Sequence, residues 1–243
     1  MLDNPLEGYL LVDKPHGITS FDCIRKLKRL IPRGTKIGHG GTLDPFATGL
    51  IIVAIGRGAT KHLGNLLGLD KCYKVAVSFG TEHDTLDNTG TEVRTCKIPE
   101  LPQIKLEEIL HSFTPGYEQV PPIFSALKSG GQSLCRLARK ESPDMDELKK
   151  IAISKCRAVK IYNIELKSMD LPEFSFSVKV SKGTYIRSLV RDIGDRCNSC
   201  ATTTALRRTR VGIFSVETAQ KLETFSSADA ILKNIISITK FHS

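Results

Sequence analysis

The sequence predicts an α+β protein built on a mixed sheet. Segments with the two-residue periodicity of strands interleave irregularly with segments of helical periodicity, unlike the strict alternation of a doubly wound parallel fold. No internal repeat of about 20–50 residues is visible. The 243 residues, 40% hydrophobic and 25% charged, suffice for one large domain or one domain with a small appendage.

Five segments predict strands. Residues 50–55 are wholly apolar, as in a buried strand. Residues 174–180 alternate phenylalanine and valine with serine and lysine, so one face packs inward and the other is polar. Residues 73–79 also alternate, and a polar loop is expected over residues 81–90. The two remaining predicted strands are residues 9–12 and 157–166.

Four segments predict helices. Thr19 and Asp22 have the spacing of a capping box, so a helix opens there, and Pro32 ends it. Apolar residues that recur every three to four positions predict its buried face, namely Phe21, Ile24, Leu27 and Ile31. The other predicted helices cover residues 106–113, 185–197 and 228–238.

Basic residues outnumber acidic ones by 35 to 26, which gives a formal net charge of +9. Such an excess favours a polyanionic partner. No apolar run approaches the ~20 residues of a bilayer span, and the N-terminus does not resemble a secretory signal. We therefore expect a cytoplasmic protein without membrane contact. Three basic groups stand out: Arg25, Lys26, Lys28 and Arg29; Arg136, Arg139 and Lys140; and Arg207, Arg208 and Arg210.

The seven cysteines are an odd number and are scattered along the chain. This usage favours reduced thiols in a cytoplasm over a disulfide framework. Cys197 and Cys200 match half of a zinc site, but no second pair of ligands follows at a suitable spacing. We therefore expect neither a disulfide framework nor a metal.

The densest chemical signal is the segment 39–49, in which glycines surround Asp44. Glycine lets the backbone approach a ligand closely, and Pro45 stiffens the turn that presents the carboxylate. Taken alone, the pattern leaves two interpretations. Asp44 either caps the following turn or carries out chemistry.

Residues 40–49 resemble the catalytic loop of the TruB family of tRNA pseudouridine synthases, which modify uridine 55 in the T loop. Five further blocks resemble the family in the same order, over about residues 9–214. One loop can match by chance, but six ordered blocks hardly can, so the resemblance favours the catalytic interpretation of Asp44. The other five blocks are residues 12–20, the strand around Tyr73, and residues 120–128, 181–187 and 206–208.

The resemblance implies a pseudouridine-synthase-like catalytic domain over residues 1–214. Its fold would be a central mixed, mainly antiparallel sheet flanked by helices and loops. It would carry a thumb-like insertion at about residues 120–145, in which Gly130 and Gly131 suit a hinge. Residues 215–243 are expected to form a short helical tail that packs back on this domain. The tail is too short for the RNA-binding PUA domain of longer relatives, so we expect reduced contact with the acceptor stem of tRNA.

The implied reaction breaks the bond between C1′ and N1 of uridine, rotates the uracil and rejoins it at C5. It involves no redox change and no group donor, so no cofactor is expected. By resemblance, Asp44 is the catalytic carboxylate. It attacks C1′ or removes the proton from C2′, and both routes stay open. Arg187 corresponds to the arginine that pairs with this carboxylate, and Tyr73 matches the tyrosine that stacks on the target uracil.

The resemblance also implies a set of substrate-binding residues. The target base must be flipped out of the T loop, and apolar and aromatic walls offset the lost stacking. Tyr185 and Leu206 match residues that line this pocket. His39 matches the histidine that fills the space left by flipped nucleotides. The expected partner of this monomer is thus the T arm of tRNA. The basic residues expected to bind substrate are Lys14, Lys128, Arg207 and Arg208.

Three other functions compete with this one. In an RNA-binding or tRNA-folding protein, catalysis would be secondary. A guide-dependent rRNA pseudouridylase is disfavoured, because such relatives rely on the C-terminal RNA-binding domain. A glycoside hydrolase needs a second acid paired with the first, and no such motif lies near Asp44.

Overall fold

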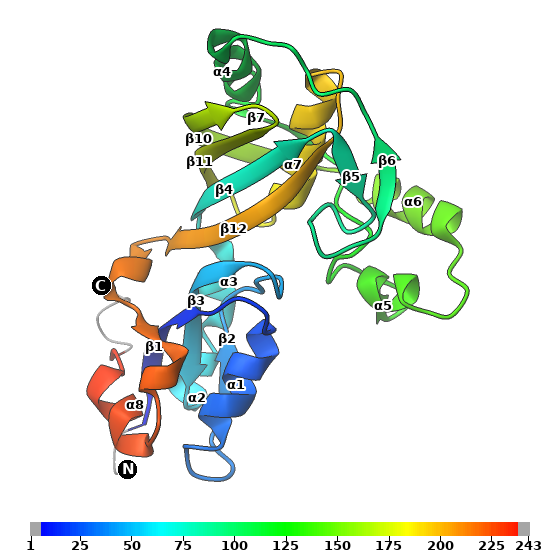
Figure 1. Ribbon diagram of the computed structural model, residues 1–243. Coiled ribbons are helices and arrows are strands. Elements are labelled where there is room, and N and C mark those ends of the chain that lie inside the picture. Colours follow the sequence, from blue (N-terminus) through cyan, green and yellow to red (C-terminus); the bar gives the residue numbers. More distant parts are fainter. Residues whose placement is uncertain (1–5, 238–243) are drawn as a thin grey trace. The chain divides into compact units, whose positions relative to one another are not determined.

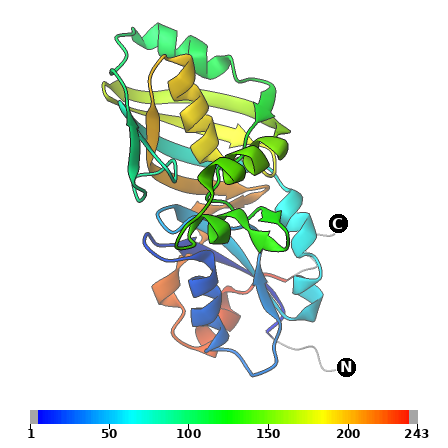
Figure 2. The ribbon, with the colours of Figure 1, turned by 90° about the vertical axis from the view of Figure 1, so that its right-hand side faces the viewer.

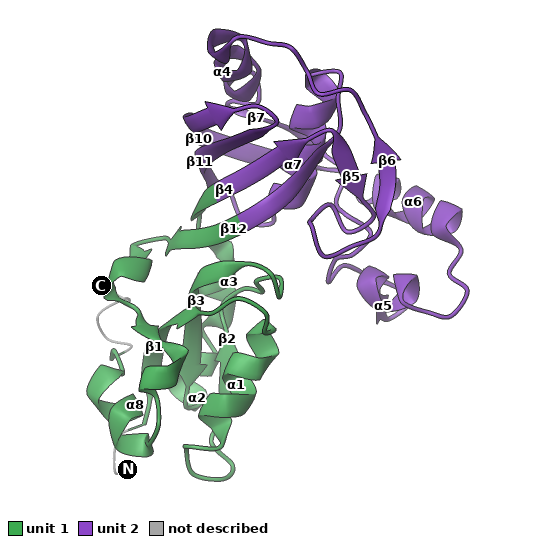
Figure 3. Cartoon of the chain, in the orientation of Figure 1, with its two compact units in different colours: residues 1–74, 206–243 green, residues 75–205 purple. Residues whose placement is uncertain are grey.

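A computed structural model describes residues 6–237 of the chain (Figure 1). The chain divides into two units (Figure 3). Unit 1 comprises Met1–Lys74 and Leu206–Ser243, and unit 2 comprises Val75–Ala205. Two strands, β4 (Lys71–Phe79) and β12 (Ala201–Val211), begin in one unit and end in the other.

The sheet of unit 1 has the strand order β14-β1-β3-β12. Strands β1 (Gly8–Lys14) and β3 (Thr48–Ile55) are antiparallel, with Leu11 opposite Ile52. β12 joins β3 in parallel, with Arg208 opposite Gly49. Three short strands complete this sheet: β14 (Gln220–Lys221) parallel to β1, β2 (Ile37–His39) on β3, and β13 (Phe214–Ser215) on β12.

Apolar side chains cover both faces of this sheet, which explains why β3 is an uninterrupted apolar run. On one face, alternate residues of β1 and β3 pack against Ile24 and Leu27 of α1 (Ser20–Lys28) and against Ile231 of α8 (Ala228–Asn234). On the other face, Ala59 and Leu66 complete the core. The remaining helical segments of unit 1 are α2 (Arg57–Thr60), α3 (Leu63–Gly68) and the 3₁₀ turns η1 (Val216–Thr218) and η2 (Leu222–Thr224).

The helix α1 confirms the capping box and corrects the buried face. The Thr19 hydroxyl accepts from Asp22 N, and the Asp22 carboxylate accepts from Thr19 N, as predicted. The predicted stripe is wrong at Phe21, which is 62% exposed. Ser20 and Cys23 take the inward positions instead, because the Ser20 hydroxyl has partners in a neighbouring loop. The helix also ends at Lys28, one turn before the predicted stop.

Unit 2 is built on the antiparallel strands β11 (Glu173–Val180), β10 (Arg157–Asp170) and β7 (Gly116–Gln119), beside β4. The predicted alternation is confirmed, since Phe174, Phe176 and Val178 are buried between exposed or half-exposed neighbours. The helix α7 (Ile186–Arg196) lies against one face of this sheet (Figure 2). α4 (Gln103–His111) packs on β10 and on α7. Both helices were predicted.

Two hairpins in unit 2 were not predicted. A polar loop was expected over residues 81–90; residues 84–90 are indeed irregular, but the first three residues form β5 (Thr81–His83), which pairs with β6 (Glu92–Thr95). The polar sequence hid these strands because their side chains are half-exposed or exposed. In the predicted thumb, Gly130 and Gly131 have φ of +56° and +81° and form the tight turn of a hairpin. Its elements are β8 (Lys128–Ser129), β9 (Gln132–Ser133), α5 (Leu134–Ala138) and α6 (Met145–Ser154).

The cysteine prediction is wrong in one respect. Cys96 and Cys200 form a disulfide across 104 residues of sequence, whereas Cys197 of the same C-x-x-C pair stays a buried thiol. Burial raises the pKa of the Cys197 thiol to about 11. The bond joins the end of the β5–β6 hairpin to the start of β12.

The C-terminal tail belongs to unit 1. β14 pairs with β1, and Leu222, Phe225 and Ile231 enter the core under α1. The predicted tail helix forms, but it spans Ala228–Asn234, and its predicted last residue, Ile238, lies outside the described residues. A domain boundary at residue 214 stays a prediction.

Candidate functional site

The loop that carries Asp44 connects β2 to β3 and is held from several sides. The Ser20 hydroxyl, buried at the start of α1, accepts from Leu43 N at 2.8 Å and donates to Leu43 O at 3.1 Å. Within the loop, Ala47 N donates to Asp44 O at 3.1 Å. Gly17 N donates to Pro45 O at 2.9 Å. The backbone on both sides of Asp44 is therefore fixed by hydrogen bonds.

Lys14 supports the same loop. Its side chain is fully buried, and Nζ donates to Ile18 O at 2.7 Å, Pro15 O at 2.9 Å and Pro45 O at 3.2 Å. Burial lowers the pKa of Lys14, and the negative charge of Asp44 partly offsets that effect. The ammonium thus places a positive charge near Asp44 while its three donors are used by the backbone. Because Lys14 is buried, it could affect substrate binding, as predicted, only by holding this loop in place.

Arg208 holds the other side of the loop. It is 1% exposed, and Nε donates to Leu50 O at 2.7 Å, while the terminal nitrogens donate to Gly41 O at 3.2 Å and Thr42 O at 3.4 Å. Gly49 has a φ of +104°, and a Cβ there would lie 2.2 Å from Arg208 O, so only glycine allows this approach. Arg208 was predicted to bind substrate. Direct contact with a phosphate would require an exposed side chain, but the Arg208 side chain is buried.

Its neighbour Arg207 is partly exposed and forms a bidentate ion pair. Its two terminal nitrogens lie 3.0 Å and 2.7 Å from the two carboxylate oxygens of Asp13. This pairing raises the pKa of Arg207. An RNA phosphate at Arg207 would have to share the guanidinium with Asp13.

Three more predicted residues belong to unit 1. Tyr73 of β4 is 9% exposed and Leu206 of β12 is 7% exposed, so both are largely covered. His39 of β2 is half-buried, and its Nδ1 is buried without a hydrogen-bond partner within the described part of the chain. Burial lowers the pKa of His39, so the imidazole is neutral at pH 7. A neutral ring can pack against a base more easily than a charged one.

In unit 2, Arg187 on the first turn of α7 is 4% exposed and firmly oriented. Its terminal nitrogens donate to Thr85 O and, at 2.9 Å, to Phe124 O. Its Nε lies 3.7 Å from the buried Asp87 carboxylate. Asp87 itself accepts hydrogen bonds from Thr85 Oγ1 and from the backbone and side chain of Thr89.

Sequence reasoning missed Asp87. The only signal was its position in the Asp- and Thr-rich segment 84–90, which also describes an ordinary turn. In the structure this segment connects β5 to β6 and supplies both a carbonyl and a carboxylate to Arg187. The hairpin therefore sets the direction of the guanidinium.

The segment before Arg187 is fixed by a second buried side chain. Gln119 accepts from Tyr185 N at 2.8 Å and donates to Tyr185 O at 3.1 Å. The Arg157 guanidinium lies 5.3 Å from the centre of the Tyr185 ring. Gln119 thereby anchors the residue that precedes α7, and Arg157 covers the phenol ring.

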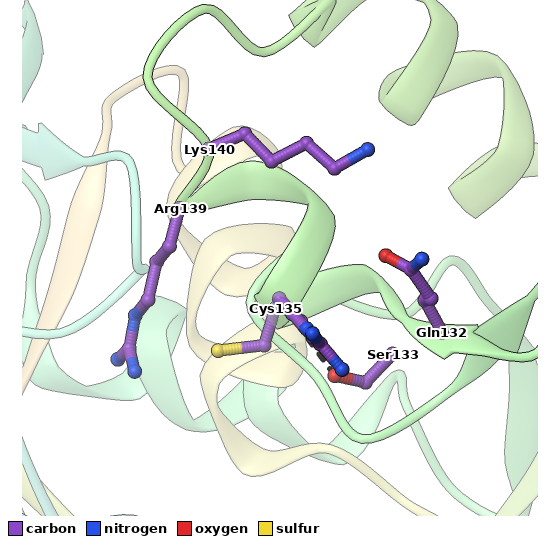
Figure 4. A pocket seen from close by; sticks show the side chains of 6 residues that line it. Gln132, Ser133, Cys135, Arg139 and Lys140 are labelled. Carbon is purple, nitrogen blue, oxygen red and sulfur yellow. Dashed lines mark hydrogen bonds between the residues drawn. The ribbon is translucent and has the colours of Figure 1, made fainter.

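The predicted thumb contains a cavity with basic side chains in its lining. Lys128 is exposed at its first strand. A cavity of about 580 Å³ beside α5 is lined by polar and basic side chains. Figure 4 shows Arg139 and Lys140 extending in different directions from the end of α5. The lining residues are Gln132, Ser133, Cys135, Arg136, Arg139 and Lys140.

The predicted site residues thus fall into two groups. Unit 1 brings together the Asp44 loop, Lys14 and Arg208, and it also contains His39, Tyr73, Leu206 and Arg207. Unit 2 contains Tyr185, Lys128 and Arg187, and the pairing of Arg187 with Asp44 stays a prediction. Over residues 6–237, no three His, Cys, Asp or Glu side chains are grouped as metal ligands. No helix within that range has the length and apolar character needed to cross a membrane.

Comparisons with known proteins define the class. Residues 28–186 match the family model described as TruB family pseudouridylate synthase (N terminal domain). The class is therefore that of the pseudouridylate synthases. The tRNA pseudouridine synthase B of Bordetella avium is 42% identical over 221 residues, which are 90% of this chain and 86% of that protein. The protein of the same name from Clostridium kluyveri is 40% identical over 97% of this chain and 77% of its own length. The chain belongs to the TruB family.

Two solved structures share the fold. One chain in a crystal structure of a Cbf5-Nop10-Gar1 complex matches with a TM-score of 0.68 and 27% identity, over 96% of this chain and 61% of that chain. One chain in an H/ACA RNP bound to a substrate RNA matches with a TM-score of 0.66 and 25% identity, over 95% of this chain and 59% of that one. This chain thus spans about three fifths of each solved chain. The predicted fold class is confirmed.

Proposed function

We propose that this chain converts uridine 55 in the T loop of tRNA to pseudouridine. The observation that carries the proposal is the Asp44 loop, which matches the family and is fixed by Ser20, Lys14 and Arg208. Two relatives at 40% identity or more over most of the chain bear the name tRNA pseudouridine synthase B. Rigid presentation of one carboxylate is what an isomerisation at a sugar carbon requires.

Asp44 is the catalytic residue of this proposal. Its carboxylate either attacks C1′ or removes the C2′ proton, and in both cases the C1′–N1 bond breaks. The released uracil rotates and its C5 bonds to C1′, while the Asp44–C1′ bond breaks in the first route or the C2′ proton is returned in the second. C5 then loses its proton, and N1 gains one. Product and substrate then have the same atoms, and no electrons are gained or lost.

The remaining residues prepare and hold this reaction. Arg187, oriented by Asp87 and Thr85, supplies the guanidinium that pairs with the Asp44 carboxylate. Tyr73, Tyr185 and Leu206 provide aromatic and apolar surface for the flipped base, whose extrusion costs a few kcal/mol of stacking. The neutral imidazole of His39 occupies space in the opened T loop.

Affinity for tRNA comes mainly from phosphates, in line with the net charge of +9. In the thumb, Arg139 and Lys140 diverge, an arrangement that suits successive phosphates of a strand better than one isolated anion (Figure 4). The chain acts as a monomer in the cytoplasm, where its tRNA substrate is found.

The test starts with unmodified tRNA transcript, incubated with the protein and mapped for pseudouridine. We expect modification at position 55 alone. Asp44→Asn is expected to abolish turnover while the Kd for tRNA changes by less than about threefold. Asp229→Asn, an exposed carboxylate on α8, is the matched control and should act like the wild type. Modification elsewhere, or turnover by Asp44→Asn, would contradict the proposal.

A further inference from the structure

The outer face of α1 combines an exposed aromatic ring with basic side chains. Phe21 is 62% exposed, and Arg25, Lys28 and Arg29 are also exposed. These residues are spaced by four, seven and eight positions from Phe21, so they share one side of the helix. We define Phe21, Arg25, Lys28 and Arg29 as the outer face of α1.

An isolated exposed apolar side chain is ordinary on protein surfaces. Phe21 differs because of its neighbours. The Arg25 guanidinium lies 5.7 Å from the ring centre, and the acid that pairs with it, at 3.1 Å, is Asp22. Asp22 is also committed to the helix cap through Thr19. The face therefore keeps a net positive charge around an exposed aromatic surface.

The position of this face ties it to the reaction loop. Phe21 follows Ser20, whose hydroxyl makes both hydrogen bonds to Leu43. Leu43 precedes Asp44 in the sequence. Phe21 and the Asp44 loop therefore belong to the same unit and are joined through Ser20.

We propose that the outer face of α1 binds an unstacked RNA nucleotide next to the target, with its base on the Phe21 ring and its phosphates near Arg25, Lys28 and Arg29. The inference rests on the proposed function and adds a stacking site to it. An aromatic ring accepts any base face, and cations beside it track the backbone, which is how proteins hold single-stranded RNA. Charge complementarity favours this polyanion over an apolar or basic protein partner, and the exposed ring favours a nucleic acid base over an acidic side chain.

The absence of tryptophan from the chain gives a direct test. Phe21→Trp introduces the only indole, and its fluorescence is titrated with unmodified tRNA transcript. We expect saturable quenching with a midpoint equal to the Kd from filter binding. The control is Ile104→Trp on α4, because Ile104 is also 62% exposed but lies three and four residues from Glu107 and Glu108. That variant should show no saturable quenching.

A second measurement separates a stacking site from a structural role. Phe21→Ala should weaken tRNA binding about tenfold and raise KM, with kcat unchanged at saturating tRNA. Phe21→Tyr should restore binding to within about twofold of the wild type, because it restores the ring.

Two results would overturn the inference. One is an unchanged fluorescence of the Phe21→Trp variant in samples where filter binding shows bound tRNA. The other is a fluorescence change that depends on the concentration of the Phe21→Trp protein and not on that of RNA. Such a change would identify this face as an interface between two copies of the chain. Both leave the proposed function intact, because the wild-type conversion assay tests that separately.

Discussion

Replacing Arg208 with lysine tests whether this residue holds the reaction loop or binds RNA. The guanidinium is buried and donates to three carbonyls, of which Gly41 O and Thr42 O belong to the loop and Leu50 O belongs to β3. Lysine keeps the positive charge but has no planar fork, so its single ammonium cannot reach all three acceptors.

The loss can be estimated from the distances. Hydrogen bonds to charged groups contribute about 1.5–3 kcal/mol each. The two loop contacts are long, at 3.2 and 3.4 Å, so we take the lower value for both. Their removal then lowers the free energy of unfolding by about 3 kcal/mol. For a chain of this size, that corresponds to a fall in Tm of roughly 6–12 °C.

The assay is urea unfolding of the free protein, together with turnover on unmodified tRNA. Arg210→Lys is the matched control, since Arg210 is exposed on the same strand. Arg208→Lys is expected to lose both stability and turnover, and Arg210→Lys neither. An unfolding free energy of Arg208→Lys within about 0.5 kcal/mol of the wild type would refute the loop-holding role.

Three further outcomes are expected. Arg187→Lys should reduce kcat more than tRNA affinity, because it keeps the charge but loses the contacts to Thr85 and Phe124; equal losses would count against a position in the pocket. Since burial lowers the pKa of His39, the unfolded state takes up a proton near pH 6.5 before the folded state does, so stability should fall as the pH drops below about 6.5. His39→Asn should flatten this fall in Tm, and an unchanged pH profile would rule out His39 as its source. Thiol titration of the unfolded, unreduced protein should find five thiols, and seven after reduction, because only Cys96 and Cys200 are paired. A value of seven without reductant would argue against the bond.

Regular side-chain alternation made the strands predictable from the sequence. In β11 and β4 every second residue is buried. This alternation is visible in the local sequence, so it can be predicted without knowing which distant residues the strand contacts. The cap of α1 was equally local, since Thr19 and Asp22 lie one turn apart. Signals of this kind depend only on residues close together in the sequence, so they can be interpreted without knowledge of tertiary contacts.

Contacts between distant residues were not predictable in the same way. Spacing could not reveal that Cys96 pairs with Cys200, because the bond needs the β5–β6 hairpin to meet β12. The spacing of Phe21 from the other apolar residues is that of one helix face. However, the hydrogen bonds between Ser20 and Leu43 orient the helix so that Phe21 faces outward. Tertiary contacts decided both cases.

Arg208 lay within reach of the sequence. It stands two residues from Leu206, so in a strand both side chains point to the same face. Had residues 206–208 been identified as a strand, a buried Leu206 would have indicated a buried Arg208, and both side chains are buried. The cluster of Arg207, Arg208 and Arg210 concealed this, because charge clusters suggest exposure.

The division of unit 1 into two stretches of chain has a consequence for biosynthesis. The ribosome releases the Asp44 loop early, but Arg208 follows more than 160 residues later in the sequence. A nascent chain therefore carries Asp44 on a loop that lacks the Arg208 contacts until β12 has been synthesised. The loop reaches its full set of hydrogen bonds only after that step.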